Sequence, residues 1–244
     1  MSPPQITVVI PAFNEQDALP STLKDLQAAT RAYAQAGAGE AEVIVVDNAS
    51  TDQTATLARD LGARVVHEPR QGIAFARNAG AAAAAAPWLF FLDADTSVPP
   101  EVLIAIDRAL SDPRCLGGAP ATRYHYRKRA LWPYMQMWKL VARLRHMTQG
   151  VGQFVTAWAF ATLGGYPTDL RMAEDTEFNW QLRKLASRRG DYTAYLGDTV
   201  IVPSSRRLDE WPIWRTILMT NPITTRMFLR SSWFWKAWRD DAVR

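Results

Sequence analysis

The feature that most constrains this chain is a run of four large apolar residues that leads directly into two aspartates. Residues 89–92 read Leu-Phe-Phe-Leu, and Asp93 and Asp95 follow with a single alanine between them. An apolar run without polar alternation is typical of a strand buried on both faces of a parallel sheet. The two carboxylates would then emerge at the carboxyl end of that strand, where open α/β sheets bind ligands. Taken alone, the pattern also suits a strand-to-loop turn capped by aspartate.

Three other apolar segments predict further strands of the same sheet. The run Ile6–Ile10 is followed by Pro11, residues 43–46 end at Asp47, and residues 63–66 form a short third strand. We expect helices after a cap at Asp17, after a cap at Ser50, Thr51 or Asp52, and over the alanine-rich residues 72–86. Strands that alternate with helices predict βαβ units, and therefore an α/β fold with a mostly parallel, Rossmann-like sheet flanked by helices.

Length and cysteine content restrict the class of protein. A chain of 244 residues can form one large core, or a core with a small appendage. The single cysteine, Cys115, excludes an internal disulfide and a cysteine-based metal site, which is consistent with a reducing compartment. No basic-then-apolar leader opens the sequence, and the longest charge-free stretch, residues 146–168, is interrupted by Gly and Gln. We therefore expect a cytoplasmic protein.

Charge is distributed unevenly between the two halves of the chain. Residues 1–112 carry 7 Lys and Arg against 14 Asp and Glu, whereas residues 113–244 carry 21 against 10. The acidic half suits a metal ion, and the basic half suits phosphates or anionic lipid. No helix-turn-helix, zinc-finger or RNP-type pattern accompanies the basic charge, so we expect no nucleic-acid partner.

The last third of the chain is rich in tryptophan and arginine. Five of the ten tryptophans lie after residue 203, at positions 211, 214, 233, 235 and 238. Asp209–Pro212 is typical of a helix start, and aromatic residues interleaved with arginine suit a segment that lies on anionic lipid. The alternative is that these rings cover the catalytic domain or form a homo-oligomer contact. We therefore divide the chain into a catalytic domain, 1–203, and a helical C-terminal segment, 204–244.

Acidic residues follow several of the predicted strands. Asn14-Glu15 comes shortly after the first apolar run, and Asp47 and the pair Asp93 and Asp95 come directly after later ones. Such strand ends meet at one crevice in a doubly wound sheet. Like charges about 4 Å apart repel by roughly 4 kcal/mol at an effective dielectric near 20. A positive group must offset that repulsion, and the candidates are a divalent cation and Arg77. Together with a diphosphate ligand, the acidic crevice implies Mg²⁺ or Mn²⁺.

A further acidic pair, Glu174-Asp175, opens a predicted helix. Acidic residues favour the first turn of a helix because of its dipole, which is sufficient reason for them to occur there. The functional interpretation is a general base that removes the proton of an acceptor hydroxyl, a role worth about 10²–10⁴-fold in rate.

These segments, in order and spacing, resemble family 2 glycosyltransferases of the GT-A fold. The matching strings are Val9–Glu15, Val46–Asp52, Gly72–Asn78, Asp93–Asp95, and Gly164–Tyr166 with Glu174-Asp175. The resemblance extends from about residue 5 to residue 190. It implies inverting transfer of a sugar from a nucleotide-diphosphate donor, UDP- or GDP-linked, with a divalent metal.

The resemblance also implies a role for each matching residue. Pro11, Ala12, Phe13 and Glu15 correspond to the cradle of the base and ribose, Asp47 to the acid that reads the base edge, and Arg77 to a basic group on base or phosphate. Asp93 corresponds to the ribose- or metal-side carboxylate, Asp95 to the metal ligand of the DXD motif, and Asp175 to the catalytic base, with Glu174 the less favoured base.

Two departures from the family pattern favour transfer of a single sugar. Processive members carry Gln-x-x-Arg-Trp after the base, and residues 181–185 here read Gln-Leu-Arg-Lys-Leu. The membrane spans of those members are also missing. We expect a non-processive enzyme whose acceptor, lipid-linked or a small molecule, is not readable from these motifs.

Two other classes of protein remain as alternatives. A nucleotidyltransferase would share the sheet and metal site, but no Gly-rich loop with an activating Lys lies near the N-terminus. A non-catalytic scaffold that docks on membranes would explain the Trp- and Arg-rich end and would leave the acidic crevice without a role. A peripheral contact with the inner face of an anionic membrane is compatible with the enzyme as well.

Overall fold

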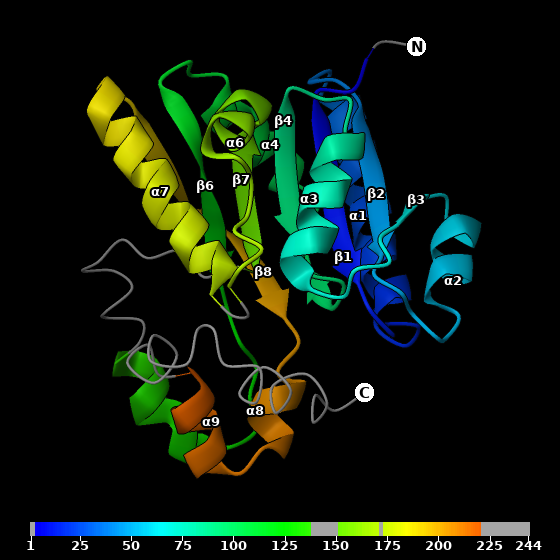
Figure 1. The fold of residues 1–244 in the computed structure, drawn as a ribbon, viewed down its shortest axis with the longest axis vertical. Helices are drawn as coiled ribbons and strands as arrows, with labels where there is room; N and C mark the ends of the chain where they lie inside the picture. Colours follow the sequence, from blue (N-terminus) through cyan, green and yellow to red (C-terminus); the bar gives the residue numbers. More distant parts are fainter. Residues whose placement is uncertain (1–2, 138–150, 171–172, 221–244) are drawn as a thin grey trace.

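An eight-stranded sheet, in the order β3-β2-β1-β4-β7-β6-β8-β5, forms the centre of the molecule (Figure 1). The computed structural model describes residues 3–137, 151–170 and 173–220, without the side chains of 207, 219 and 220. The strands are β1 (Ile6–Ala12), β2 (Ala41–Asp47), β3 (Arg64–His67), β4 (Trp88–Leu92), β5 (Thr96–Ser97), β6 (Cys115–Thr122), β7 (Gly152–Thr156) and β8 (Tyr192–Pro203). The helices are α1 (Leu19–Gln35), α2 (Thr54–Asp60), α3 (Ile73–Ala83), α4 (Val102–Leu110), the 3₁₀ turn η1 (Arg129–Leu131), α6 (Ala157–Leu163), α7 (Glu174–Arg189), α8 (Arg206–Glu210) and α9 (Ile213–Thr220).

The predicted α/β class and mostly parallel sheet are confirmed. The pairs β1–β2, β1–β4, β2–β3 and β6–β8 are parallel. The pairs β4–β7, β6–β7 and β5–β8 are antiparallel. Helices cover both faces: Val8 and Phe90 pack in the core with α1 and α4, whereas Val9 and Phe91 pack with α3, α6 and α7. Because neighbouring residues of one strand enter opposite cores, the strands show no polar alternation.

Strand β1 continues beyond the predicted end at Ile10. It includes Pro11 and ends at Ala12, and Pro11 pairs with Val46 of β2. The other neighbour, β4, pairs with β1 only as far as Val9. Pro11 therefore lies where β1 has a partner on one side only, a position at which the missing N–H is tolerated.

The predicted cap of α1 is wrong, because no side chain caps that helix and Asp17 does not have the role. Of the three residues predicted to cap α2, which begins at Thr54, Asp52 binds its first turn: Asp52 Oδ1 accepts a hydrogen bond from Thr54 N at 3.0 Å. Ser50 binds elsewhere, since its Oγ accepts a hydrogen bond from Asn14 N at 3.1 Å. Its hydroxyl therefore satisfies the backbone of the neighbouring loop in place of the helix terminus.

The strands β6 and β7 and helix α6 were not predicted from the sequence, and α3 ends at Ala83 rather than at residue 86. Strand β6 contains Gly117, Gly118 and Pro120, which are poor strand formers. Glycine is required because a Cβ on Gly118 would lie 1.9 Å from the carbonyl oxygen of Ala194 in β8. Close approach of two backbones therefore decides the residue type here.

A small helical unit, which we call the helical cap, lies below the carboxyl edge of the sheet (Figure 1). It consists of residues 123–137 and 204–220. The two segments are joined by a hydrogen bond from Lys128 Nζ to Trp211 O at 2.6 Å, and by a core of Leu131, Met135 and Leu208. The sequence-based division at residue 203 placed the first of these segments in the other domain.

The helix predicted near Asp209–Pro212 is present as two short helices, α8 and α9. Pro212 O accepts hydrogen bonds from the backbone N of Arg215 and Thr216, so Pro212 lies just before the first residue of α9. Residues 221–244, with three of the five C-terminal tryptophans, lie outside the described part of the chain. In that described part, each helix is too short or too polar to cross a bilayer.

Candidate active site

The loops that follow β1 and β2 are tied together at the carboxyl edge of the sheet. Asn14 Oδ1 accepts a hydrogen bond from Thr51 N at 2.8 Å, and Glu15 N donates to Thr54 Oγ1 at 2.8 Å. Asn14 has a φ of 53°, a left-handed conformation that asparagine adopts more readily than most residues. These bonds fix the position of Glu15 relative to the end of β2.

Asp47 is the last residue of β2 and lies beside the end of β1. In register it is opposite Ala12, and the half-buried Phe13 follows. Its carboxylate is nearly buried, with Oδ1 accepting from Ser50 N at 3.1 Å and Oδ2 lying 3.2 Å from His67 Nδ1. The structure thus groups Asp47 with Pro11–Phe13, on the β2 side of the edge.

The buried ion cluster consists of Arg77, Asp93 and Glu174. Arg77 lies on α3 and is 2% exposed. Its Nη1 donates to Glu174 Oε1 at 2.7 Å and its Nη2 to Asp93 Oδ1 at 3.0 Å. The guanidinium also lies 5.2 Å from the centroid of the Tyr166 ring. Arg77 was predicted to contact base or phosphate, and in the structure both terminal nitrogens bind carboxylates.

The pKa values of the two carboxyl groups that bind Arg77 are raised. Burial raises the pKa of Asp93 to about 6; Arg77 opposes the shift, and Asp95 and Asp175 add to it. Burial, together with Asp175, raises the pKa of Glu174 from 4.5 to about 7, again against the effect of Arg77. One guanidinium faces several carboxylates, so these carboxyls keep their protons to a higher pH than isolated carboxyls would. Because Arg77 bridges Asp93 and Glu174, it also brings their chain neighbours Asp95 and Asp175 to the same edge of the sheet.

The exposed ion cluster consists of Glu15, Asp95 and Arg206. Arg206 is the first residue of α8, and its Nη2 donates to Glu15 Oε2 at 2.9 Å and to Asp95 Oδ2 at 3.2 Å. The three side chains are 23%, 26% and 32% exposed, respectively.

Strand pairing explains why Arg206 reaches the crevice. Strand β5 follows Asp95 directly and pairs with the end of β8, with Thr96 opposite Pro203. Ser204 N then donates to Asp95 O at 3.0 Å. The helical cap is therefore joined to the sheet at Asp95 itself, a long-range pairing that no local sequence signal reveals.

Glu174 and Asp175 are neighbours in different surroundings. Glu174 is buried against Arg77, whereas Asp175 is half-buried and its Oδ1 accepts a hydrogen bond from Thr176 N at 2.6 Å. Gln153 of β7 anchors this turn, since its Nε2 donates to Asp175 O at 3.1 Å. Tyr166 holds Gln153 in turn, through a 2.7 Å hydrogen bond from its hydroxyl to Gln153 Oε1. Of the two acids, Asp175 is the more accessible to a second substrate.

The donor set fits a cation that is shared with a phosphate ligand. Among the described residues, no group of three or more His, Cys, Asp or Glu side chains is arranged to hold a metal ion. The carboxylates of Glu15 and Asp95 nevertheless converge on one positive group, Arg206. Mg²⁺ is commonly bound by one or two carboxylates together with substrate phosphates, so an all-protein cage is not required.

A doubly covered α/β sheet with acidic residues gathered at its carboxyl edge is the arrangement of a GT-A glycosyltransferase. The family model described as "Glycosyl transferase family 2" matches residues 7–165, more than half of the chain. The protein therefore belongs to glycosyltransferase family 2.

Curated relatives match only part of the chain. An uncharacterised glycosyltransferase of Mycobacterium tuberculosis is 40% identical over 107 residues, which are 42% of this chain and 44% of the relative. A PGL/p-HBAD biosynthesis glycosyltransferase of the same organism is 33% identical over 104 residues, 40% of this chain and 38% of the relative. The chain thus spans less than half the length of the curated relatives it matches.

Solved structures share the fold over most of the chain. A mannosyltransferase of Pyrobaculum calidifontis, in complex with GDP-Man and Mn²⁺, has a TM-score of 0.61 and 25% identity, and covers 83% of this chain and 57% of its own. Glucosyl-3-phosphoglycerate synthase of M. tuberculosis, with Mn²⁺, UDP and glucosyl-3-phosphoglycerate, has a TM-score of 0.63 and 19% identity, and covers 93% and 80%.

Proposed function

We propose that this protein is an inverting, non-processive glycosyltransferase that moves a sugar from a UDP- or GDP-linked donor to an acceptor hydroxyl. The observation that carries the proposal is the Arg77 bridge between Asp93 and Glu174, which brings Asp95 and the accessible Asp175 to one edge of the sheet. The two structural neighbours bound to GDP-Man and to UDP, each with Mn²⁺, support this donor class.

The nucleotide would lie along the ends of β1 and β2. Pro11–Phe13 and Glu15 form one side of its site and Asp47 the other, with Asp93 towards the ribose or metal. We assign Arg77 a positioning role rather than a donor contact, because its terminal nitrogens are already bound to Asp93 and Glu174. It holds two carboxylates in place that would otherwise repel each other.

Asp95 would hold a Mg²⁺ or Mn²⁺ ion together with the diphosphate, and Glu15 lies beside it. When bound, the ion stabilises the negative charge that develops on the leaving nucleoside diphosphate. Arg206 already brings positive charge to both carboxylates. Donor loading must displace its guanidinium from Asp95, which leaves it free to bind a phosphate oxygen.

Asp175 would act as the general base. It accepts the proton of the acceptor hydroxyl while that oxygen forms a bond to the anomeric carbon. The bond from this carbon to the diphosphate oxygen breaks on the opposite side, with its electron pair, so the single displacement inverts the anomeric centre. No carboxylate nucleophile is needed. The neighbouring Glu174 is a poor candidate because Arg77 and the core enclose it.

The test of this function is Asp175→Asn, with Glu177→Gln, two residues further along α7, as the matched control. We first identify the nucleotide by the shift in melting temperature with UDP, GDP or TDP, with and without Mn²⁺. Asp175→Asn is then expected to lower transfer, or hydrolysis of the donor where no acceptor is known, by about 10²–10⁴-fold. Nucleotide affinity should stay within about twofold, because the base does not contact the nucleotide. Unchanged turnover would refute the role of Asp175.

The alternatives are separated by the same assay. Mn²⁺-dependent release of nucleoside diphosphate from a nucleotide-sugar supports a transferase. A nucleotidyltransferase would release pyrophosphate from a nucleoside triphosphate instead, and a non-catalytic scaffold would release neither.

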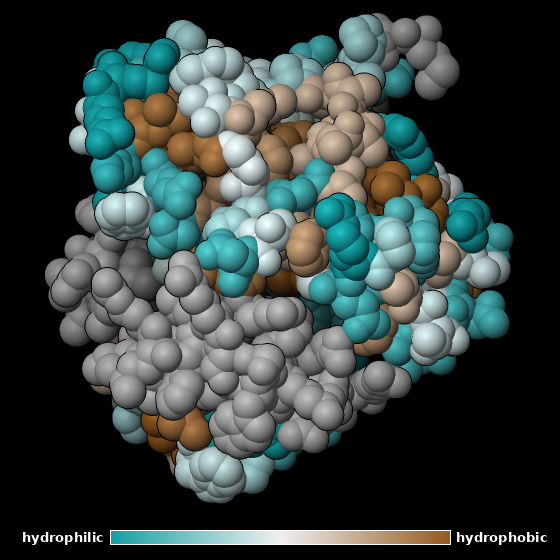
Figure 2. Space-filling view, viewed as in Figure 1, coloured by the Kyte–Doolittle hydropathy of each residue, from teal (hydrophilic) through white to brown (hydrophobic). Residues whose placement is uncertain are grey.

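We also propose peripheral contact with the inner face of an anionic membrane, through α9. This helix exposes Trp214 (67%) together with Ile213, Ile217 and Leu218, and Figure 2 shows apolar side chains at the surface of the helical cap. Residues 123–137 add four basic residues and no acidic one. An apolar face beside basic charge binds anionic lipid.

Co-sedimentation with vesicles tests the membrane contact. The full chain should bind phosphatidylglycerol vesicles more tightly than phosphatidylcholine vesicles, and Trp214→Ser should reduce that binding. A homo-oligomer, recognised by light scattering and lost in the same variant, would show that α9 contacts a second copy instead.

A further inference from the structure

We propose that a cavity in the helical cap is the acceptor site, and that it takes an acceptor in which a ring lies beside a phosphate or carboxylate group. This inference rests on the proposed function, because the ligand of the cavity is an acceptor only if the protein transfers a sugar. The cavity has a volume of about 690 Å³, within the range of small-molecule sites. It is lined by Tyr124, His125, Tyr126, Arg129, Ala130, Trp132, Pro133 and Gln136.

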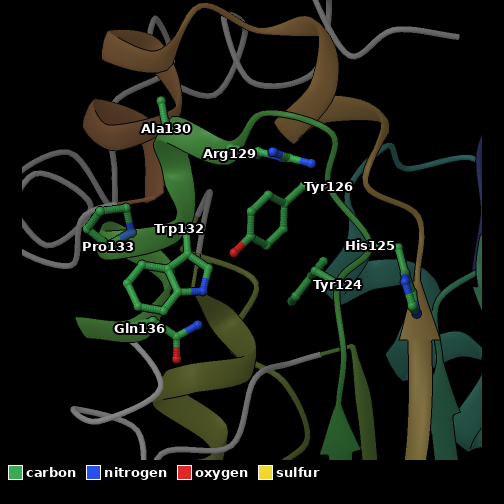
Figure 3. A pocket seen from close by; sticks show the side chains of 8 residues that line it. All are labelled: Tyr124, His125, Tyr126, Arg129, Ala130, Trp132, Pro133 and Gln136. Atoms are coloured by element: carbon green, nitrogen blue, oxygen red, sulfur yellow. The ribbon is translucent and has the colours of Figure 1, made fainter.

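The walls of the cavity combine aromatic rings with positive charge. Figure 3 shows the ring of Tyr126 between Trp132 and Tyr124, with Arg129 extending along one side. Trp132 is 58% exposed, an unusual state for so large an apolar side chain. Flat aromatic faces at an open site favour a ring-shaped ligand.

Among the described residues that line the cavity none is acidic, and Arg129 brings positive charge to it. Among the described residues, Arg129 takes part in no ion pair, in contrast to Arg77 and Arg206. Arg127 and Lys128 come just before it in the chain. A guanidinium without an internal carboxylate partner is suited to bind a phosphate or carboxylate of a ligand, with two parallel hydrogen bonds.

A hydrogen bond links the wall of the cavity to the segment that carries the exposed ion cluster. Ser205 Oγ donates to the carbonyl oxygen of His125, a lining residue, at 2.6 Å. The next residue after Ser205 is Arg206, which is bound to Asp95. In Figure 1 the first turn of α7, which carries Asp175, points towards the helical cap. An acceptor held in the cavity would thus lie beside the segment that carries Arg206, on the side of the helical cap that the first turn of α7 faces.

The donor is a poor candidate for the same cavity. None of the residues expected to bind nucleotide, from Pro11 to Asp95, lines it. The nucleotide region is acidic and requires a cation, whereas the cavity is basic. The opposite charges of the two sites make each site selective: the basic cavity favours an anionic acceptor, and the acidic region favours a donor that is bound together with a metal ion.

The test uses phenyl phosphate as a probe, with its neutral relative phenyl β-glucoside, measured by calorimetry on the full chain. Arg129→Gln should weaken phenyl phosphate about tenfold or more, through loss of a charge-assisted hydrogen bond. Trp132→Ala should weaken both probes, and Trp132→Phe should restore most of the affinity because it keeps a ring. Arg59→Gln, on the exposed side of α2, is the matched control and should change nothing.

A second comparison distinguishes a lipid-linked acceptor from a soluble one. Tighter binding of a short isoprenyl phosphate than of phenyl phosphate indicates a lipid-linked acceptor, and the reverse order indicates a soluble one. Equal binding of phenyl phosphate to the wild type, Arg129→Gln and Trp132→Ala would overturn the site. The nucleotide screen with Mn²⁺ is read in parallel. Loss of nucleotide binding with the phosphate site intact would refute the proposed function, and the reverse result would refute only the acceptor site.

Discussion

Two ion clusters lie at the same edge of the sheet, and they differ in the origin of their cation. In the buried ion cluster, Arg77 comes from the sheet-covering helix α3 and is 2% exposed between Asp93 and Glu174. In the exposed ion cluster, Arg206 comes from the helical cap and its side chain is 32% exposed. The arginine of the buried ion cluster therefore belongs to the sheet and its covering helices, whereas the arginine of the exposed ion cluster belongs to the helical cap.

The difference indicates which carboxylates are available to a ligand. An ion pair inside the core is costly to break, because the remaining charge stays buried without a partner. An exposed pair contributes little, and water or another cation can replace either member. We therefore expect the buried ion cluster to maintain the shape of the site and the exposed ion cluster to exchange its arginine for metal and diphosphate. The following predictions, in decreasing order of expected effect, test that contrast.

The largest effect is expected for Arg77→Met. The variant keeps an apolar stem in the core but leaves Asp93 and Glu174 buried without their cation, which should lower the free energy of unfolding by about 3–5 kcal/mol. Urea denaturation at neutral pH measures it. A loss below about 1 kcal/mol would show that this cluster is no more essential than a surface pair.

Glu174→Gln should change how stability depends on pH. Since the pKa of Glu174 is raised from 4.5 to about 7 in the folded state, its contribution is fully present below pH 4.5 and is lost as the pH rises through 7. Across that window the wild type should lose about 1–3 kcal/mol more than the variant, which cannot ionise. Urea denaturation at several pH values gives the two curves, with Glu177→Gln as the control. Parallel curves would contradict the shift.

Asp95→Ala should weaken Mn²⁺-dependent nucleotide binding by about tenfold or more, equivalent to about 1.4 kcal/mol. Calorimetry with the nucleotide found in the screen, with Mn²⁺ and with EDTA, separates the metal-dependent part. The same affinity for wild type and variant in Mn²⁺ would exclude Asp95 as a ligand of the ion.

The smallest effect is expected for Arg206→Gln. Its partners are partly exposed, so unfolding free energy should change by about 0–1 kcal/mol, and the change should shrink further at high salt. Urea denaturation at low and high salt measures both. A loss comparable to that of Arg77→Met would mean that the two clusters are equivalent, and the proposed exchange of the arginine would fail.

Some residues of the site could be identified from the sequence, whereas the pairings between them could not. Asp93 and Asp95 follow an apolar run that identifies both the strand and its end, and Asp47 follows another. The pairing of Arg77 with Glu174 has no local signal, because 97 residues separate them. The same holds for Arg206 and Glu15, which are 191 residues apart.

The sequence by itself determined the α/β class, the strands β1, β2 and β4, and the family, because these depend on local apolar runs and on short ordered motifs. Tertiary structure alone decided that Arg206 reaches Asp95 and that residues 123–137 pack with α8 and α9. It also decided that Glu174 is buried while Asp175 is accessible. The physical reason is that burial and ion pairing depend on which distant strands lie side by side, and the pairing of β5 with β8 is fixed by the whole sheet rather than by the residues at either end.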